Sequence, residues 1–153
     1  TGLSASTTYY FAVYAYNGSA LSSVLQGSQA TAAATTWSTV PGDFTLNVGA
    51  GTATSANKAY VLAGASGNTT FTFVKQSGDT MLNPQFAAGT STNPTNWTNP
   101  GSTITLSAGT NYYVRVRHDF REVWIGREAV YRVTATNNSV ADTMDVTLGI
   151  TGA

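Results

Sequence analysis

Cysteine is absent from the sequence and charge is scarce. Without cysteine, neither a disulfide framework nor a thiolate metal site is possible, and the redox compartment stays undetermined. Charged residues make up 9% of the chain, against about 25% in typical soluble domains. Because nucleic-acid partners need clustered Lys and Arg, we expect none here. A surface of uncharged Thr, Ser, Asn and Gly is common in secreted and virion surface proteins.

Long hydrophobic runs and catalytic motifs are absent as well. The longest apolar run is a handful of residues, far short of the roughly 20 that cross a bilayer, so no membrane insertion is expected. No nucleophile elbow, Walker loop or dinucleotide-binding fingerprint occurs, and GAGTAT at 49–54 lacks the final glycine and the following helix. We therefore expect a protein that is not an enzyme and needs no cofactor.

The acid–base residues are few. His118 is the sole histidine, and it falls on the inward parity of its strand with Val114 and Val116, so we expect a hydrogen-bonded structural histidine rather than a base. Glu122 and Glu128 could form the carboxylate pair of a glycosidase. They lie among arginines, however, and nearby positive charge lowers a carboxyl pKa and disfavours its use as an acid. We expect them to form surface ion pairs on a hairpin.

A metal site is also not expected. Asp79, Asp142 and Asp145 are carboxylates that could contribute to a calcium site in a loop. Calcium takes about six to eight oxygen ligands, and the sequence contains no dense acidic loop. No metal ligands are therefore assigned.

Short alternating runs rich in Val, Thr, Tyr and Phe recur between Gly, Asn, Pro and Ser, a pattern typical of an all-β antiparallel sandwich. The clearest strand is the last, in which Met144, Val146, Leu148 and Ile150 share one face that we expect to be buried. The predicted strands are 8–17, 27–35, 43–49, 58–64, 69–76, 102–107, 111–121, 128–136 and 142–151.

Two segments interrupt the strand pattern. Residues 77–101 contain three Asn-Pro steps, which favour extended or turn conformations and remove ladder donors, so a long surface connection is predicted. The segment TTWSTVPGD at 35–43 ends the first alternating pattern in a Pro-Gly turn. We place a module boundary there, between 1–36 and 37–153.

The segment LSASTTYYFAV, from Leu3, is followed about a hundred residues later by LSAGTNYYVRV, from Leu106, with six matches in the first eight positions. In the first copy, Tyr9 follows Leu3 by six residues and leads into alternating apolar residues and an Asn-Gly turn. This resembles the end of a fibronectin type III domain. The resemblance covers residues 1–36 and implies that they are its last two strands, with Tyr9 as the tyrosine corner whose hydroxyl bonds to the backbone upstream.

The second copy repeats the pattern from Leu106 to Tyr112. Residues 37–153 therefore resemble a second immunoglobulin-like or fibronectin-like sandwich, with Tyr112 as its corner. The resemblance is incomplete, because two predicted strands follow the corner strand instead of one and the connection before it is long.

Residues 1–36 are too few to form a stable sheet alone, because a two-stranded hairpin is marginal in water. They could pack into the sandwich of 37–153, belong with strands of a longer parent chain, or be completed by another subunit. Tyr10, Tyr14 and Tyr16 form an outward stripe in a stretch with no charge before Asp43. Such a stripe indicates a surface that a partner covers, and we take these tyrosines as candidate partner contacts.

Carbohydrate is the ligand class that the sequence leaves open. Trp97 lies in the Asn-Pro segment with nothing nearby that we expect to bury it, and exposed aromatic planes stack on sugar faces. Trp37 and Trp124 lie near strand ends, where they could instead fill the seam and pack under a hairpin. We take Trp97 as the candidate sugar or partner contact.

These observations favour a non-catalytic structural or interaction module of an extracellular, cell-surface or virion assembly. A bacterial surface fibre, an adhesin and a phage tail or decoration protein are the expected types, with protein subunits of the same assembly as partners. The alternative is a carbohydrate-binding accessory module of a secreted hydrolase. The sequence alone does not identify the partner, the oligomeric state or the source, and because it begins at Thr1 the chain could be a processed form or part of a longer one.

Overall fold

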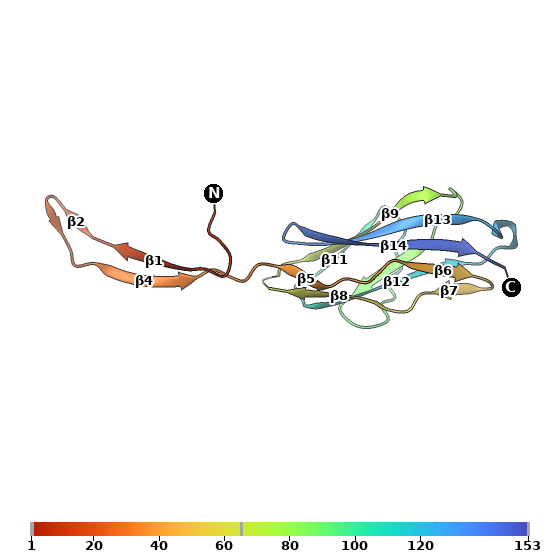
Figure 1. Ribbon diagram of the computed structural model, residues 1–153, viewed down its shortest axis with the longest axis horizontal. Coiled ribbons are helices and arrows are strands. Elements are labelled where there is room, and N and C mark those ends of the chain that lie inside the picture. The colour runs from red at the N-terminus through yellow and green to blue at the C-terminus, as the bar shows by residue number, and fades with distance from the viewer. Residues whose placement is uncertain (1, 65, 153) are drawn as a thin grey trace. The chain divides into compact units, whose positions relative to one another are not determined.

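The computed structural model describes residues 2–64 and 66–152. These residues are almost entirely strands and connecting turns, with no α-helix among them (Figure 1), so the all-β prediction is confirmed. No helix in the described ranges is long and apolar enough to cross a membrane. The chain divides into two compact units, Thr1–Ala34 (unit 1) and Thr35–Ala153 (unit 2). The expected boundary falls two residues later, but Thr36 and Trp37 begin a strand that pairs within unit 2.

Unit 1 is an antiparallel β-ribbon. Its main part pairs β1 (Thr8–Val13) with β4 (Leu25–Ala30), and its tip pairs β2 (Tyr16–Asn17) with β3 (Ala20–Leu21). The tip turns at Gly18, whose φ of +62° is a conformation that glycine adopts without steric strain. The predicted strand 8–17 is thus interrupted between β1 and β2. The predicted strand 27–35 corresponds to β4, which begins two residues earlier and is shorter.

Unit 2 consists of two five-stranded sheets. One has the order β10-β12-β8-β5, with β7 also paired to β12, and the other has the order β11-β9-β13-β14-β6. All these pairs are antiparallel except β14 and β6, which are parallel. The elements are β5 (Thr36–Thr39), β6 (Phe44–Val48), β7 (Thr52–Thr54), β8 (Lys58–Ala63), β9 (Thr69–Gly78), β10 (Gln85–Gly89), β11 (Thr103–Leu106), β12 (Asn111–Asp119), the 3-10 turn η1 (Glu122–Trp124), β13 (Glu128–Asn137) and β14 (Val140–Ile150).

Side chains from both sheets form one hydrophobic core, which gives unit 2 a sandwich-like architecture. The alternation predicted for the last strand is confirmed, because Met144, Val146, Leu148 and Ile150 on β14 are all buried. The opposite sheet contributes Tyr112, Val114 and Val116 from β12, and Tyr60 and Leu62 from β8.

The predicted surface connection at 77–101 is wrong over part of its length. It contains β10, and residues 86–88 at the centre of this strand are buried. Pro84 precedes the strand, so its missing N–H removes no ladder hydrogen bond, and the next proline is Pro94. Two short strands, β5 and β7, were also not predicted.

The two LSAxTxYY copies lead into strands with different neighbours. β1 pairs with β4, the third strand after it, which is the return strand of the ribbon. β12 pairs with β7, β8 and β10, all of which precede it in the sequence, and the chain then crosses to the other sheet as β13. The two copies of the repeat therefore form similar turns, but the strands that follow them occupy different positions in their sheets.

Candidate functional site

Both corner tyrosines bond to the backbone a few residues upstream. The Tyr9 hydroxyl accepts a hydrogen bond from the Ser4 N–H at 2.7 Å, and the Tyr112 hydroxyl donates one to the Gly109 carbonyl at 2.9 Å. Each bond closes the turn that leads into its strand. The direction of donation differs, and Tyr112 is fully buried whereas Tyr9 is only partly covered.

The tyrosines singled out as partner contacts lie exposed on unit 1. Tyr10 is 83% exposed, Tyr16 72% and Tyr14 54%. Phe11 and Val13, which alternate with Tyr10 along β1, are also more than half exposed. The ribbon therefore presents large hydrophobic side chains on both faces.

Trp97 is half-buried, contrary to the expectation that nothing nearby would cover it. The guanidinium groups of Arg115 and Arg117 lie over its ring, 5.2 and 4.4 Å from the centroid. Arg115 is held there by two hydrogen bonds from its guanidinium to the Pro94 carbonyl. A sugar that stacked on the ring face occupied by these arginines would have to displace them.

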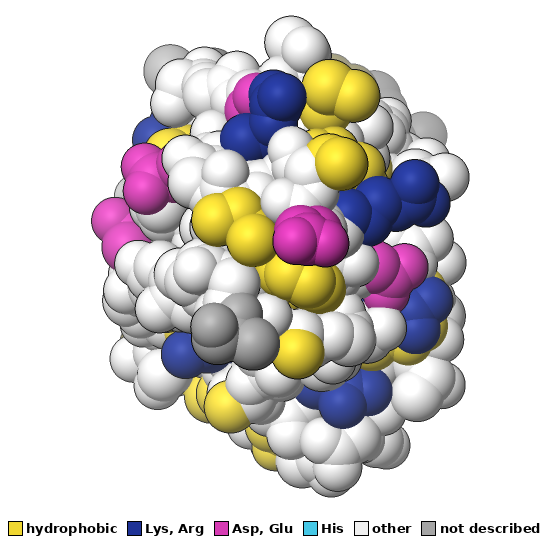
Figure 2. Space-filling view, turned by 90° about the vertical axis from the view of Figure 1, so that its right-hand side faces the viewer, with side chains coloured by type: hydrophobic (Ala, Val, Ile, Leu, Met, Phe, Trp, Pro, Cys, Tyr) yellow, Lys and Arg dark blue, Asp and Glu magenta, His cyan; other side chains and the backbone are white. Residues whose placement is uncertain are grey.

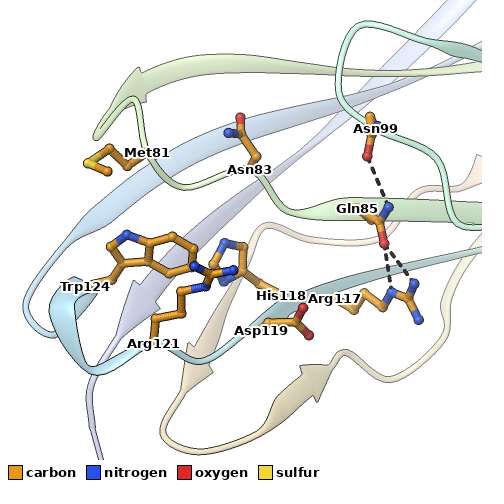
Figure 3. Close-up of a pocket in the computed structure, with 9 residues that line it drawn as sticks. All are labelled: Met81, Asn83, Gln85, Asn99, Arg117, His118, Asp119, Arg121 and Trp124. Atoms are coloured by element: carbon orange, nitrogen blue, oxygen red, sulfur yellow. Dashed lines mark hydrogen bonds between the residues drawn. The ribbon is translucent and has the colours of Figure 1, made fainter.

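One concave feature of unit 2 is a cleft of about 410 Å³, which we call the arginine cleft (Figure 3). This volume lies within the usual range for small-ligand sites. In Figure 3, Met81, Arg121 and Trp124 lie at one end and Gln85, Asn99 and Arg117 at the other. The residues that line it are Met81, Asn83, Gln85, Asn99, Arg117, His118, Asp119, Arg121 and Trp124.

A hydrogen-bonded chain fixes one end of the arginine cleft. The Gln85 side-chain carbonyl accepts hydrogen bonds from Nε and Nη2 of Arg117, at 3.1 and 2.8 Å. The Gln85 amide then donates to Oδ1 of Asn99 at 3.1 Å. Gln85 and Arg117 face each other across the β10–β12 pair, so the strand register positions both groups.

At the other end of the cleft, the Trp124 ring packs against His118 and Arg121. The His118 and Trp124 centroids are 5.3 Å apart, and the Arg121 guanidinium lies 5.0 Å from the Trp124 centroid. His118 is only 5% exposed, and this burial lowers its pKa, so the imidazole is neutral at neutral pH. Its predicted burial is confirmed, and its Nδ1 is a buried atom with no hydrogen-bond partner among the described residues.

The carboxylates form different pairs from those predicted. Arg127 pairs with Asp79 and Arg132 with Asp145, whereas the sequence interpretation had placed Glu122 and Glu128 in such pairs. Arg132 donates from Nε and Nη2 to the two carboxylate oxygens of Asp145, at 2.7 and 2.9 Å. Over residues 2–64 and 66–152, no group of three His, Asp or Glu side chains could hold a metal ion.

Sequence reasoning did not find the arginine cleft. One wall comes from residues 81–99, which the sequence predicts to be part of a surface connection. The other comes from residues 117–124, for which the sequence predicts a charged hairpin. Only the pairing of β10 with β12 brings them together. The one available signal was the unusual density of arginine after residue 115.

Comparisons with known proteins give only distant likenesses. No protein-family model matches the chain, and no curated protein matches it. Among solved structures, the N-terminal domain of PorA is similar at a TM-score of 0.39 and 12% identity, over 71% of this chain and 88% of that one. Two endo-fucoidan hydrolases of glycoside hydrolase family 107, MfFcnA4 (H294Q) and MfFcnA9, are similar at TM-scores of 0.35 and 0.31, each at 8% identity. Alignments to these hydrolases cover 97% and 95% of this chain but 19% and 22% of theirs, and TM-scores this low support no argument about function.

Proposed function

We propose that this chain is a non-catalytic structural and interaction module of an extracellular or virion surface assembly, and that unit 1 is its docking element. The observation that carries the proposal is the β1–β4 ribbon, which exposes hydrophobic side chains on both faces. A two-stranded ribbon is marginally stable at best in water. Unit 1 therefore needs additional β-structure to cover it.

The edges of the ribbon are open to added strands. Within the described residues, β1 and β4 pair only with each other. Proteins protect such edges with Lys, Pro or β-bulges. Residues 2–34 contain no charge and no proline, and the register runs from Thr8 opposite Ala30 to Val13 opposite Leu25 without a bulge. An unprotected edge of this kind accepts a strand from a partner.

The partner that we propose is unit 1 of a second copy. Two uncharged ribbons meet without like-charge repulsion, and a symmetric face-to-face contact covers the tyrosine face of each copy. The partner thus has the chemistry that the ribbon requires, namely free strand edges and large hydrophobic side chains.

For unit 2 we propose an immunoglobulin-like topology. In that fold, strands A, B, E and D form one sheet and C, F and G the other. The order β5-β8-β12-β10 matches A-B-E-D, and β9-β13-β14 matches C-F-G. Three strands are then additions: β6 and β7 between A and B, and β11 between D and E.

This assignment alters the role of Tyr112. In the fibronectin-like pattern, the corner tyrosine precedes strand F, whereas β12 corresponds to strand E by its neighbours β8 and β10. The strand that corresponds to F is β13, where the buried Tyr131 donates its hydroxyl to the Leu82 carbonyl at 2.5 Å. The sandwich assignment therefore rests on strand order rather than on the tyrosine motif.

A non-catalytic role is supported by the state of the acid–base residues. His118 is buried against Trp124. Hydrogen bonds from the Met81 N–H and Arg127 lower the pKa of Asp79, and those from Arg132 lower the pKa of Asp145. The surface location is supported by the low charge of the chain and its wealth of uncharged polar residues.

Sedimentation velocity over a range of concentrations tests the docking role. We expect the chain to self-associate and Tyr10→Lys to abolish association, because a charge on the tyrosine face would be buried in the contact. Ser19→Lys adds the same charge at the turn of the tip and is the matched control. A chain that stays monomeric at every concentration would overturn the second-copy partner.

A further inference from the structure

From the arginine cleft we infer a second binding function, namely recognition of an acidic oligosaccharide whose sugar rings carry carboxylate or sulfate groups. The cleft belongs to unit 2, so this function does not depend on docking by unit 1. Two guanidinium groups, three side-chain amides and an indole line one concave surface.

The arginines of the cleft differ from Arg127 and Arg132 in having no carboxylate partner. Arg127 and Arg132 each form an ion pair with an aspartate. Arg117 and Arg121 form none with any described carboxylate, although both line the cleft. Guanidinium groups bind carboxylate and sulfate oxygens through paired N–H donors. Two unpaired guanidiniums in one cleft are suited to an anionic ligand.

Both guanidiniums are held in place by contacts that leave donors available. Arg117 uses Nε and Nη2 to bond Gln85, so these bonds leave Nη1 unused. Arg121 is positioned by its stacking on Trp124, and a stacking contact consumes no N–H donor. Because these contacts pre-orient the side chains, less conformational freedom is lost when a ligand binds.

The side-chain amides that line the cleft indicate that the acidic group of the ligand is attached to a sugar. Asn83 presents a carbonyl acceptor and an amide donor in one plane, which complements neighbouring hydroxyl groups on a sugar ring, and Gln85 and Asn99 each keep an amide N–H that their mutual hydrogen bond does not use. The Gln85–Asn99 hydrogen bond fixes the orientation of these two amides. Asp119, whose Oδ1 accepts a hydrogen bond from Thr52 at 2.6 Å, adds a further acceptor.

The cleft has one end suited to the apolar face of a sugar ring. Met81 and Trp124 lie there beside Arg121 (Figure 3), and Met81 is 54% exposed. The elongated distribution of polar groups from Trp124 to Asn99 matches a short linear segment rather than a single small anion. The sugar contact expected at Trp97 is thereby assigned to Trp124, because Arg115 and Arg117 already lie over the Trp97 ring.

The positive character of the cleft is local. On the end of unit 2 toward which β6 and β14 run, basic and acidic side chains are interspersed with hydrophobic ones (Figure 2), and the whole chain has no net charge. A broad polyanion such as nucleic acid would require an extended basic surface. Two guanidiniums within a strip of amides instead favour a ligand with spaced charges among many hydroxyls.

Isothermal titration calorimetry on the full chain in about 0.15 M NaCl, where long-range attraction is largely screened, tests this inference. The probes are oligogalacturonate for carboxylated sugars, sulfated dextran oligosaccharides for sulfated sugars and unmodified dextran oligosaccharides as the neutral control. We expect saturable binding of at least one acidic probe. We expect Arg121→Gln to weaken it about tenfold or more, the effect of losing a charge-assisted hydrogen bond.

Arg115→Gln is the matched control, because it removes the same charge from a neighbouring position on β12, where Arg115 faces Trp97 and does not line the cleft. It should change the affinity less than about twofold, within the effect of a screened surface charge. Arg121 is exposed, so its replacement should leave the unfolding temperature unchanged. Failure of both acidic probes to bind would overturn the inference. So would equal binding of neutral dextran, or an equal loss in Arg115→Gln.

Discussion

Gly27 lies directly opposite Phe11 in the β1–β4 ribbon, and the Phe11 ring occupies the space where a side chain on Gly27 would stand. A ring laid over a cross-strand glycine shields its backbone, a contact known to stabilise glycines in sheets. The pair is a side-chain contact that unit 1 makes within its own ribbon.

Replacement of Gly27 by alanine should therefore loosen the ribbon. The new Cβ would overlap the Phe11 ring, which must swing away and uncover the strand. We expect faster backbone amide exchange in β1 and β4, with β9 and β13 unchanged. Ser28→Ala, at the next position on β4, is the control. Equal exchange in the two variants would show that the ring contact does not stabilise the ribbon.

Gly78→Ala should destabilise unit 2 more than Gly101→Ala. Both glycines have positive φ, of +92° and +88°, so both variants incur the left-handed strain of about 1 kcal/mol. At Gly78 alone the new Cβ would also overlap the backbone at Glu128 and Ala129, whereas nothing lies within 4 Å at Gly101. We expect a total loss of about 2 kcal/mol or more at Gly78, measured by urea unfolding. Equal losses would contradict the close approach of β9 and β13.

Tyr112→Phe should lower the free energy of unfolding by about 1 kcal/mol, because it removes a buried hydrogen bond and leaves the Gly109 carbonyl without this donor. Tyr113→Phe is the matched control, since the Tyr113 hydroxyl makes no hydrogen bond within the described residues. Urea unfolding of both variants is the measurement. A Tyr112→Phe protein as stable as Tyr113→Phe would show that the hydroxyl does not hold the turn.

Stability should fall as the pH is lowered through the acidic range. The hydrogen bonds from Arg132 lower the pKa of Asp145, and those from the Met81 N–H and Arg127 lower the pKa of Asp79. In the unfolded chain these carboxyls titrate near their ordinary value of about 3.9. The unfolded state then binds protons first, so the stabilisation is complete above about pH 4 and is lost as pH falls through the lower pKa values of the folded state.

Asp145→Asn tests this pH dependence. Urea unfolding between about pH 5 and about pH 2 should show a shallower loss of stability in this variant. The effect should be modest, because the Arg132–Asp145 pair is partly exposed. Asp142→Asn removes a carboxylate that forms no ion pair with any described residue and serves as control. Superimposable pH profiles for wild type and Asp145→Asn would contradict the assigned role.

The sequence predicts the long strands of unit 2 well because one face of each is buried. Alternation in β14 and β12 marks the inward residues, and even His118 could be placed on the buried face from its parity. Short strands such as β5 and β7 could not be recognised, because three or four residues contain too few alternations to form a pattern. β10 was hidden by the prolines that flank it.

The candidate sites differ in how far sequence could identify them. The exposure of Tyr10, Tyr14 and Tyr16 in unit 1 could be predicted from the local sequence, although they do not share one strand, because β1 ends at Val13 and Tyr16 lies on β2. The arginine cleft is non-local, because Gln85 and Arg117 are brought together by strand pairing across 32 residues. Trp97 was singled out as exposed, but arginines from β12 cover it, and no local pattern reveals that contact.

The central claim is that unit 1 is an incomplete sheet that a second copy covers. Backbone amide exchange of the full chain, measured at low and high protein concentration, tests it most directly. We predict that β1 and β4 exchange rapidly in the dilute monomer while β9 and β13 are protected, and that β1 and β4 become protected as the chain associates. Protection of β1 and β4 in a monomer at every concentration would contradict the claim, because the ribbon would then be stable without a partner.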